Sequence, residues 1–404
     1  MKERALRAIA ECRHIAAMTE EPGRITRRFL TPPTREVHTH LRTRMQALGM
    51  TVHVDAAGNL RGRSAIAGRR LLLGSHIDTV PDAGAFDGVL GVTLALECAD
   101  LACEMSRPLA VDVIAFSEEE GVRFGVPFLG SRAAAGRFDP ALLALNDEAG
   151  HTLAEAIRAY GLDPDQIPAA ALDEKTLGFI EIHIEQGPVL EAENLSVASV
   201  TGIVGQTRLT IEFAGQANHA GTTPMHLRHD ALTGAAEWIG SIEKQAKRTE
   251  GLVATVGKIE VSPNAGNVIA GAARVSLDAR HLQDTVRLSA VNEMIEAATT
   301  IAARRGLAVQ CTHQLDQPAA SMDDKLTAYL ADAMEMTGLP QKRMPSGAGH
   351  DAMVMAARLP AAMLFLRSPG GISHHPAESV REEDVEASLH VMRRFLQRLS
   401  VEIR

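Results

Sequence analysis

The sequence has little of the material on which several protein classes depend. Aromatic residues make up only 3% of its 404 residues, with a single tryptophan, so a platform for stacking nucleic-acid bases is not expected. The net charge of −9 argues against a broad phosphate-binding surface. No apolar run approaches the roughly 18 residues of a membrane span, and the first residues lack the apolar centre of a signal peptide. We therefore expect a cytoplasmic protein that binds neither nucleic acid nor a membrane.

Cysteine is also scarce. The four cysteines, Cys12, Cys98, Cys103 and Cys311, form no Cys-x-x-Cys pair. Their spacing predicts neither a disulfide framework nor a cysteine metal site, and free thiols in a reducing compartment are the simpler interpretation. The remaining composition, 46% hydrophobic and 23% charged, is that of an ordinary globular protein. A chain of this length exceeds one core of usual size, so two domains are expected.

Alternating strand and helix patterns at both ends of the chain predict an α/β fold with a mainly parallel sheet. Buried-strand runs cover residues 70–75, 109–116, 178–184 and 361–366, and a helical pattern covers 91–105. These segments flank a middle region of different character, so the α/β domain is predicted to be interrupted.

The middle region opens with residues 207–213, where polar and apolar residues alternate as in a sheet with one exposed face. Strand patterns lie at 207–213, 252–261, 273–280 and 307–313, and helical patterns at 224–247 and 286–305. This β-α-β-β-α-β order is the split βαβ pattern of a ferredoxin-like layer. We therefore predict a two-domain α/β protein, with residues 1–205 and 317–404 forming one domain and 206–316 an inserted α+β domain.

Four clusters of potential metal ligands each lie at or just after the end of a predicted strand, at the edge where open α/β sheets place their sites. In the first cluster, His76 can bind a metal through one ring nitrogen while Asp78 fixes the other. Asp87 follows and offers two oxygens, enough to bridge two ions. The alternative is that His76 and Asp78 merely bond each other in a turn.

The other clusters add carboxylates and histidines. Three adjacent glutamates, Glu118 to Glu120, follow a buried strand, where unpaired charges are costly and a cation is a natural partner. His183 lies at another strand end, and a glycine pair precedes His374 and His375. Singly, each cluster also fits a solvated turn or a structural histidine. Together, two to three histidines and two carboxylates without cysteine favour a hydrolytic Zn, Mn, Co or Ni centre.

Six segments carry a resemblance over nearly the whole chain: GSHIDTVPDAGAFDGVLG, FSEEEGVRFGVPFLGS, EIHIEQGPVLE, GQANHAGTTPM, SGAGHDAM and GGISHHPAE. In this order, they resemble the M20 family of metallopeptidases and amidases, in particular its hydantoinase/carbamoylase branch. The resemblance implies an α/β metallohydrolase domain with an inserted ferredoxin-like dimerisation, or lid, domain. It also implies two divalent ions per subunit, Zn or Mn. Of these ions, His76 and His183 would bind one, Glu120 and His374 the other, with Asp87 bridging.

Catalytic roles follow from the same resemblance. The glutamate directly before glycine is the family's ligand, so Glu119 is expected to be the general base that takes a proton from the attacking water. A shift of one residue would make Glu118 the base, and this alternative stays open. Asp78 is expected to support catalysis from beside the metal site. His350 and Asp351 resemble residues that support the site, without a defined role.

The inserted domain supplies the remaining expected site residues. His219 resembles the histidine that stabilises the tetrahedral oxyanion, reaching the partner subunit's site, so a homodimer is expected. Asn267 and Arg280 match positions that clamp a substrate carboxylate, a task suited to the planar fork of arginine. Gln186, in the other domain, matches a further substrate contact. The alternative for Arg280 is an exposed salt bridge at a strand end.

The resemblance implies hydrolysis of a ureido C–N bond in a small molecule that carries a carboxylate. Allantoate, which would yield ureidoglycine, ammonia and carbon dioxide, is the favoured substrate. The segments FLGSRAAAG, GIVGQTRL and SGAGHDAMVMA most resemble those of allantoate-cleaving members of the family. N-carbamoyl-L-amino acids are the main alternative, with ureidoglycolate and β-ureidopropionate behind them. An interpretation of another class is a catalytically inactive metal-binding scaffold.

Overall fold

The computed structural model describes residues 1–173 and 175–402. Within these residues the chain divides into two compact units. Unit 1 contains Met1–Thr201 and Ser321–Arg404, and unit 2 contains Gly202–Ala320. The predicted insertion at 206–316 falls inside unit 2.

Unit 1 is built on a mixed sheet whose strands run in the order β1-β2-β4-β3-β5-β14-β6-β12, with β13 paired to β6. The strands are β1 (Thr51–Val54), β2 (Leu60–Arg63), β3 (Arg70–His76), β4 (Ala110–Phe116), β5 (Thr176–Ile184), β6 (Val197–Ile203), β12 (Ala320–Ser321), β13 (Arg343–Ser346) and β14 (Ala361–Leu366). The central four, β4, β3, β5 and β14, are parallel. Parallel central strands are normally buried on both faces, which explains their continuous apolar runs.

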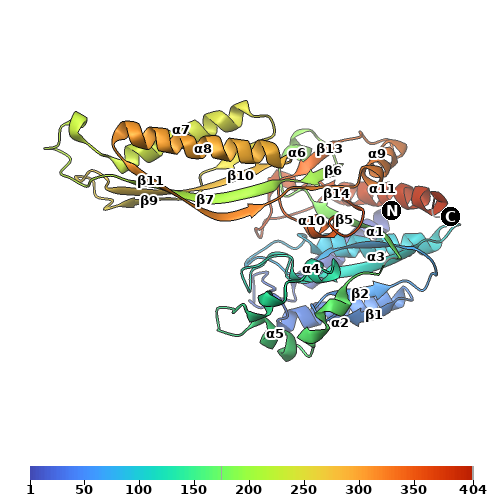
Figure 1. The fold of residues 1–404 in the computed structure, drawn as a ribbon. Helices are drawn as coiled ribbons and strands as arrows, with labels where there is room; N and C mark the ends of the chain where they lie inside the picture. Colours follow the sequence, from blue (N-terminus) through green and yellow to red (C-terminus); the bar gives the residue numbers. More distant parts are fainter. Residues whose placement is uncertain (174, 403–404) are drawn as a thin grey trace. The chain divides into compact units, whose positions relative to one another are not determined.

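Helices cover this sheet (Figure 1). They are α1 (Lys2–Ala16), α2 (Pro32–Ala47), α3 (Val89–Glu104), α4 (Leu129–Ala134), α5 (Leu153–Ala159), α6 (Val189–Ala192), α9 (Asp324–Met336), α10 (Asp351–Met355) and α11 (Glu382–Glu402). Helix α3 is apolar on nearly every side and packs against α1, α11 and the strands β3, β4 and β5. A helix that is hydrophobic all round belongs in a core, and α3 is central to this one.

The register of the parallel strands brings the chemically important segments to one edge. His76, the last residue of β3, pairs with Phe116, the last residue of β4. Ile184, which ends β5, pairs with Leu366, which ends β14. Each of the predicted ligand clusters therefore leaves the sheet at its carboxyl edge, where open α/β sheets place their sites.

Unit 2 is a five-stranded antiparallel sheet, with α7 (Ala231–Arg248) and α8 (Asp284–Arg305) packed together on one face (Figure 1). Its strands are β7 (Gly205–Ala214), β8 (Val253–Thr255), β9 (Ile259–Ser262), β10 (Ala272–His281) and β11 (Ala308–Gln317). The order β11-β7-β10-β8, with β9 also on β10, is that of a ferredoxin-like layer. Its inward residues, centred on the fully buried Trp238, form a core of their own.

Two boundaries in unit 2 differ from the sequence prediction. The helix predicted from residue 224 begins at Ala231, because Asp230 caps it by accepting hydrogen bonds from the backbone N–H groups of Leu232 and Thr233. The strand predicted over 252–261 is two short strands, β8 and β9, which pair with different parts of β10. Local capping and pairing decide both cases, and hydrophobic alternation does not report either.

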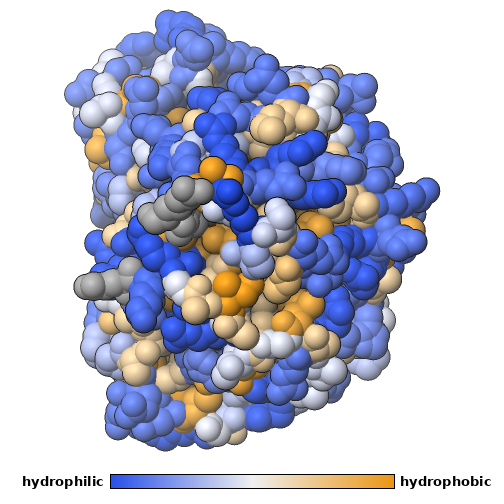
Figure 2. Space-filling view, turned by 90° about the vertical axis from the view of Figure 1, so that its right-hand side faces the viewer, coloured by the Kyte–Doolittle hydropathy of each residue, from blue (hydrophilic) through white to orange (hydrophobic). Residues whose placement is uncertain are grey.

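Among the described residues, no helix is both long enough and apolar enough to cross a membrane. The face of the molecule in Figure 2 is mostly hydrophilic, and its hydrophobic residues form small groups. Scattered apolar side chains of this kind are normal on a protein surface.

Candidate metal centre

The five predicted metal ligands converge at the carboxyl edge of the unit 1 sheet. The Asp87 carboxylate lies in the middle, with Oδ1 3.3 Å from His183 Nε2 and Oδ2 3.1 Å from His374 Nε2. His76 Nε2 is 3.5 Å from His183 Nε2, and Glu120 Oε1 is 3.3 Å from His374 Nε2. Asp87 therefore stands between a pair of histidines on one side and a His–Glu pair on the other.

These spacings fit divalent metal ions. Donor atoms about 2.0–2.1 Å from a tetrahedral Zn ion lie about 3.3–3.4 Å from one another. The sets His76–Asp87–His183 and Asp87–Glu120–His374 each bring one donor atom per residue within 4.8 Å of the others. Two nitrogen- and oxygen-containing sets that share one carboxylate are the donor chemistry of a two-metal hydrolytic site.

The backbone fixes which ring nitrogen each buried histidine offers. His76 Nδ1 lies 3.0 Å from the carbonyl oxygen of Asp78, and His183 Nδ1 lies 2.9 Å from that of Ile184. A carbonyl only accepts, so both Nδ1 atoms carry the proton, and Nε2 is left to face the centre. Gly88 leaves room for this arrangement, because a Cβ there would stand 2.5 Å from the His76 ring.

The charges of the ligands are strongly interdependent. Burial lowers the pKa of His76, but the carboxylates of Asp78, Asp87 and Glu120 outweigh it and raise that pKa to about 9. Hydrogen bonds to Asp87 and Glu120 raise the pKa of His374 to about 10. Burial works to raise the pKa of Asp87, yet the surrounding histidines hold it well below its usual range. A cluster in which histidines carry protons among carboxylates is one where metal ions replace those protons on binding.

The three adjacent glutamates point in different directions. Glu118 is fully buried, and its carboxylate accepts hydrogen bonds from the backbone N–H groups of Phe29, Arg123 and Phe124. Burial and nearby Asp78 nevertheless raise the pKa of Glu118 to about 8. Glu118 is thus tied into the loop structure and faces the backbone.

Glu119 and Glu120 face the centre instead. Both carboxylates have an oxygen within 4.8 Å of a nitrogen of His76 and of each other. Burial, followed by the charge of Glu120, raises the pKa of Glu119 well above its usual value. A buried carboxylate with a raised pKa beside candidate metal ligands is a candidate for proton transfer.

Asp78 acts differently from the sequence expectation. Its carboxylate is 3.7 Å from His76 Nδ1, and the closer partner of that ring is the Asp78 backbone oxygen. The two carboxylate oxygens accept from the backbone N–H groups of Glu119 and Glu120, each at 3.0 Å. Asp78 therefore orients the glutamate loop with its side chain and the histidine with its backbone.

Arg27 holds the backbone that directly follows His76. It is 1% exposed, and its guanidinium donates to three backbone carbonyl oxygens, those of Ile77, Ile15 and Met18. Burial lowers its pKa to about 10 although Asp78 lies nearby. Nothing in the residue pattern distinguishes this arginine, and its role was missed from the sequence.

Gln186 lies over the centre with a backbone φ of 57°. Its Nε2 is 3.2 Å from both oxygens of Asp87, 3.2 Å from Ser373 Oγ and 3.3 Å from His374 Nε2. The predicted substrate contact therefore sits directly beside the shared carboxylate.

In unit 2, His219 occupies a loop whose backbone sets its tautomer. Its Nδ1 accepts hydrogen bonds from the N–H groups of Gly221 and Thr222, so the ring proton resides on the exposed Nε2. His219 also forms a β-bridge with Val268, next to Asn267. His219 and Asn267 thus share one end of unit 2.

Arg280 lies at the opposite end of β10. That strand pairs Ala272 with Ala214, near the His219 loop, and Arg280 with Gln206. Eight residues of extended strand separate Ala272 from Arg280, which is about 27 Å. Arg280 donates to both carboxylate oxygens of Asp278, at 2.8 and 2.9 Å. The structure therefore places Asn267 and Arg280 too far apart to hold one carboxylate within a single chain.

Three further residues surround the ligands. Glu181 accepts from Ser75 Oγ and from the backbone N–H of Ala352, and it shares a strand face with His183, a signal visible in the sequence. The His350 ring packs against that of His183, with centroids 4.5 Å apart, and its Nε2 meets Ser346 Oγ. Burial raises the pKa of Asp351 well above its usual value, followed by the charge of Glu181.

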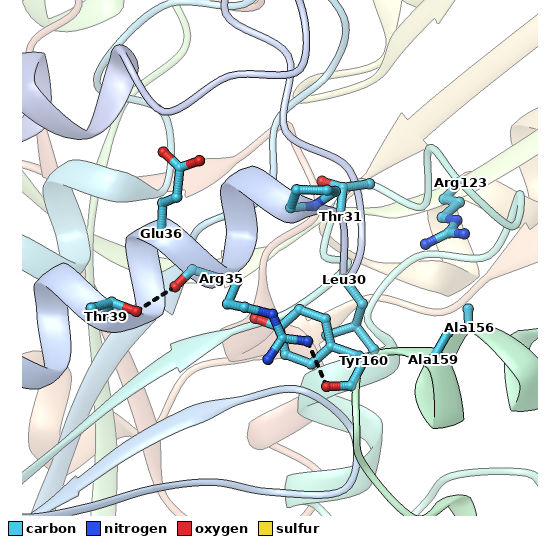
Figure 3. Close-up of a pocket in the computed structure, with 10 residues that line it drawn as sticks. Leu30, Thr31, Arg35, Glu36, Thr39, Arg123, Ala156, Ala159 and Tyr160 are labelled. Carbon is cyan, nitrogen blue, oxygen red and sulfur yellow. Dashed lines mark hydrogen bonds between the residues drawn. The ribbon is translucent and has the colours of Figure 1, made fainter.

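Unit 1 also contains a pocket of about 480 Å³ that includes none of the predicted site residues. The Arg35 guanidinium lies over the ring of Tyr160, 4.0 Å from its centroid, and donates to the Tyr160 backbone oxygen (Figure 3). Arg123, on the far wall, already donates to Asp147 and to the Phe29 carbonyl. Both guanidinium groups therefore have protein acceptors.

Comparison with known proteins identifies the architecture. The model of peptidase family M20/M25/M40 matches residues 72–398. The N-carbamoyl-L-amino acid amidohydrolase of Geobacillus stearothermophilus is 39% identical over 92% of either chain. The allantoate deiminase of Arabidopsis thaliana is 35% identical over 96% of this chain and 81% of its own. The crystal structure of a hydantoinase/carbamoylase family amidase from Burkholderia multivorans superposes with a TM-score of 0.91 at 31% identity, covering 98% of this chain and 97% of that one.

Proposed function

Because the chain belongs to peptidase family M20/M25/M40, we propose that it is a two-metal amidohydrolase that cleaves a ureido C–N bond in a small carboxylate-bearing substrate. The observation that carries the proposal is the convergence of four candidate ligands around Asp87, in a chain whose relatives act on carbamoyl amino acids and allantoate. Allantoate is the first candidate substrate, with ureidoglycine, ammonia and carbon dioxide as products.

Two divalent ions, Zn or Mn, would be held by His76, His183, Glu120 and His374, with Asp87 shared. When bound, such ions polarise the scissile carbonyl and make water nucleophilic near neutral pH. The ligand set supports either metal, because imidazole and carboxylate donors suit both.

Glu119 is proposed as the general base. Its carboxylate stands beside His76 and Glu120, and its raised pKa suits a group that takes a proton from the attacking water and returns it to the leaving nitrogen. Glu118 is less suited to that role, because its carboxylate already accepts three backbone N–H groups.

His219 is proposed to stabilise the oxyanion of the tetrahedral intermediate. Because Nδ1 accepts two backbone hydrogen bonds, Nε2 is an obligatory donor when the ring is neutral. A donor fixed in advance at the developing charge contributes about 3–4 kcal/mol to transition-state stabilisation in comparable sites.

A homodimer is proposed from the separation of the clamp residues. If Asn267 and Arg280 both hold the substrate carboxylate, they come from different protomers, since the part of β10 from Ala272 to Arg280, about 27 Å long, lies between them within one chain. Arg280 would then exchange one or both of its contacts with Asp278 for the substrate. The exposed Met225 and Leu227, close in sequence to His219, are suited to burial against a partner.

A second candidate substrate class is N-carbamoyl-L-amino acids, favoured by the 39% identity to the Geobacillus stearothermophilus enzyme. Both candidates place a carboxylate near a ureido group, so the same base, donor and clamp would serve. Cytoplasmic location is likewise a proposal, tested by cell fractionation.

The deciding experiment measures ammonia release from allantoate, ureidoglycolate and a series of N-carbamoyl amino acids, with Zn- and Mn-loaded protein in parallel. A preference of at least tenfold in kcat/KM for one class identifies the substrate. Metal-free protein is the control for metal dependence. Fully loaded protein that hydrolyses none of these compounds would leave a metal-binding scaffold as the better description.

A further inference from the structure

We propose that Glu378 is a positioning residue that fixes the carboxylate of Asp87 relative to the segment carrying His374. It thereby sets the affinity of the second metal ion, the one that Asp87, Glu120 and His374 would bind. This inference rests on the proposed two-metal function. Glu378 follows His374 by four residues and does not reach into the centre through its own carboxylate oxygens. Its contacts are with the residues that carry the ligands.

The first contact is with the backbone that presents Asp87. Glu378 is 6% exposed, and its Oε1 accepts hydrogen bonds from the N–H groups of Phe86, at 2.9 Å, and Asp87, at 3.0 Å. The bonded residues Asp87 and Glu378 are 291 positions apart in the chain. Asp87 stands just before α3, whose N-cap Gly88 provides no side chain to orient the turn. The orientation of Asp87 therefore depends on an acceptor from elsewhere.

The second contact is with the segment that presents His374. Glu378 Oε2 accepts a hydrogen bond from Ser373 Oγ at 3.2 Å, directly before His374 in the chain. Ser373 Oγ is also 3.2 Å from Gln186 Nε2, which in turn donates to Asp87. The bonds form a closed circuit that runs from Glu378 to Asp87, Gln186 and Ser373 and back to Glu378.

The fit around Glu378 is close. A Cβ on Gly84 would lie 2.4 Å from both the Cβ and the Oε1 of Glu378. Glycine at position 84 therefore gives the Glu378 side chain the space to reach the two N–H groups. A Gly84→Ala substitution would therefore displace the Glu378 side chain without removing it.

The hydrogen-bond circuit is expected to matter more for one of the two proposed ion sites than for the other. His76 and His183, 2% exposed each, are fixed by hydrogen bonds from their own Nδ1 atoms to backbone oxygens. His374 has a 46% exposed side chain and a left-handed backbone with φ of 56°, so its position depends more on neighbouring contacts. Loss of Glu378 should therefore weaken the Asp87–Glu120–His374 site more than the site of the two buried histidines.

The test measures Zn affinity and stoichiometry of full-length wild-type protein and of E378A, E378Q and G84A, by competition with chelators of known affinity. We expect E378A and G84A to lower the affinity for the second ion by about 10–100-fold, the range for residues that orient metal ligands. The affinity for the first ion, at His76, Asp87 and His183, should fall by less than threefold. E378Q keeps an oxygen for both backbone N–H groups, and Ser373 Oγ can rotate to accept from its amide, so it should stay within about threefold of wild type.

Two outcomes would overturn the proposal. E378A and G84A with wild-type affinity at both sites would show that the circuit does not set metal binding. Equal weakening of both ions would indicate a general structural role. If E378A does not fold, G84A and E378D, whose shorter side chain cannot reach both N–H groups, provide the same comparison against E378Q. Failure of the proposed function is separately visible, because protein that binds two ions yet hydrolyses no ureido compound leaves the positioning role intact.

Discussion

Glu119→Gln tests the proposed base most directly. The substitution keeps the size of the side chain and removes its ability to take a proton. General-base catalysis typically contributes 10²–10⁴-fold, equivalent to about 2.7–5.4 kcal/mol in the activation free energy. Because Glu119 is outside the proposed ligand set, we expect two ions per chain to be retained while kcat falls by at least a hundredfold.

Glu118→Gln is the matched control, one residue away. The Glu118 oxygens accept from Phe29 on one side and from Arg123 and Phe124 on the other. Above the raised Glu118 pKa of about 8, at pH 9 for example, both oxygens accept hydrogen bonds. Glutamine has one oxygen, so its amide group must then face one of these N–H groups, and a buried unsatisfied donor costs about 1–3 kcal/mol. At about 2–4 °C per kcal/mol for a domain of 150–250 residues, the melting temperature should fall by roughly 2–12 °C, with less than tenfold loss of kcat.

The assay combines ammonia release at saturating substrate, metal content by mass spectrometry and thermal unfolding, all on the same preparations. The reasoning is refuted if the Glu119 variant, with both ions bound, keeps more than a tenth of wild-type kcat. A Glu118 variant with wild-type melting temperature and metal content but a hundredfold lower kcat would move the base to Glu118.

Further predictions address other parts of the molecule. Arg27→Met should destabilise unit 1 by about 2 kcal/mol or more, because the carbonyl oxygens of Ile77 and Met18 lose the Arg27 donor, while that of Ile15 keeps the N–H of Met18; denaturant unfolding that shows less than 1 kcal/mol would contradict this. Burial lowers the pKa of His38 to about 3, so its contribution to stability is complete above the unfolded value of about 6.5 and declines as the pH falls toward 3. Between pH 7 and pH 4.5 the loss is about 2.5 kcal/mol, and H38Q should abolish this pH dependence, as urea unfolding at the two pH values will show. Arg280→Ala should reduce kcat/KM most for substrates with a carboxylate, and an equal loss for neutral amides would exclude the clamp.

The convergence of the proposed ligands could be predicted from residue type and from the positions of the strand ends. His76, Asp87, Glu120, His183 and His374 meet because parallel strands bring their carboxyl ends to one edge, and that edge can be predicted from apolar runs. The arrangement of Asp78 could not be predicted, because a side-chain and a backbone oxygen of the same residue compete for His76 and the choice depends on loop geometry.

Long-range hydrogen bonds account for most of what was missed. Glu378 and Arg27 act on backbone groups, which leave no mark on the pattern of side chains. The separation of Asn267 from Arg280 was hidden for another reason. Thirteen positions in a sequence can be a compact turn or a long strand, and only the pairing of β10 with β7 shows which.

The junction between the two units has a consequence for how the chain can be divided. On the side of unit 2, Gln206 and Gln317 are paired neighbours on adjacent strands. On the side of unit 1, the N–H of Met322 donates to the carbonyl of Thr201 at 3.1 Å. In each unit, the two chain segments that lead to the other unit are therefore hydrogen-bonded neighbours. A turn of a few residues joining 201 to 322 would leave a protein that keeps the five proposed metal ligands and lacks His219, Asn267 and Arg280. Metal binding could then be measured apart from the proposed oxyanion donor and carboxylate clamp.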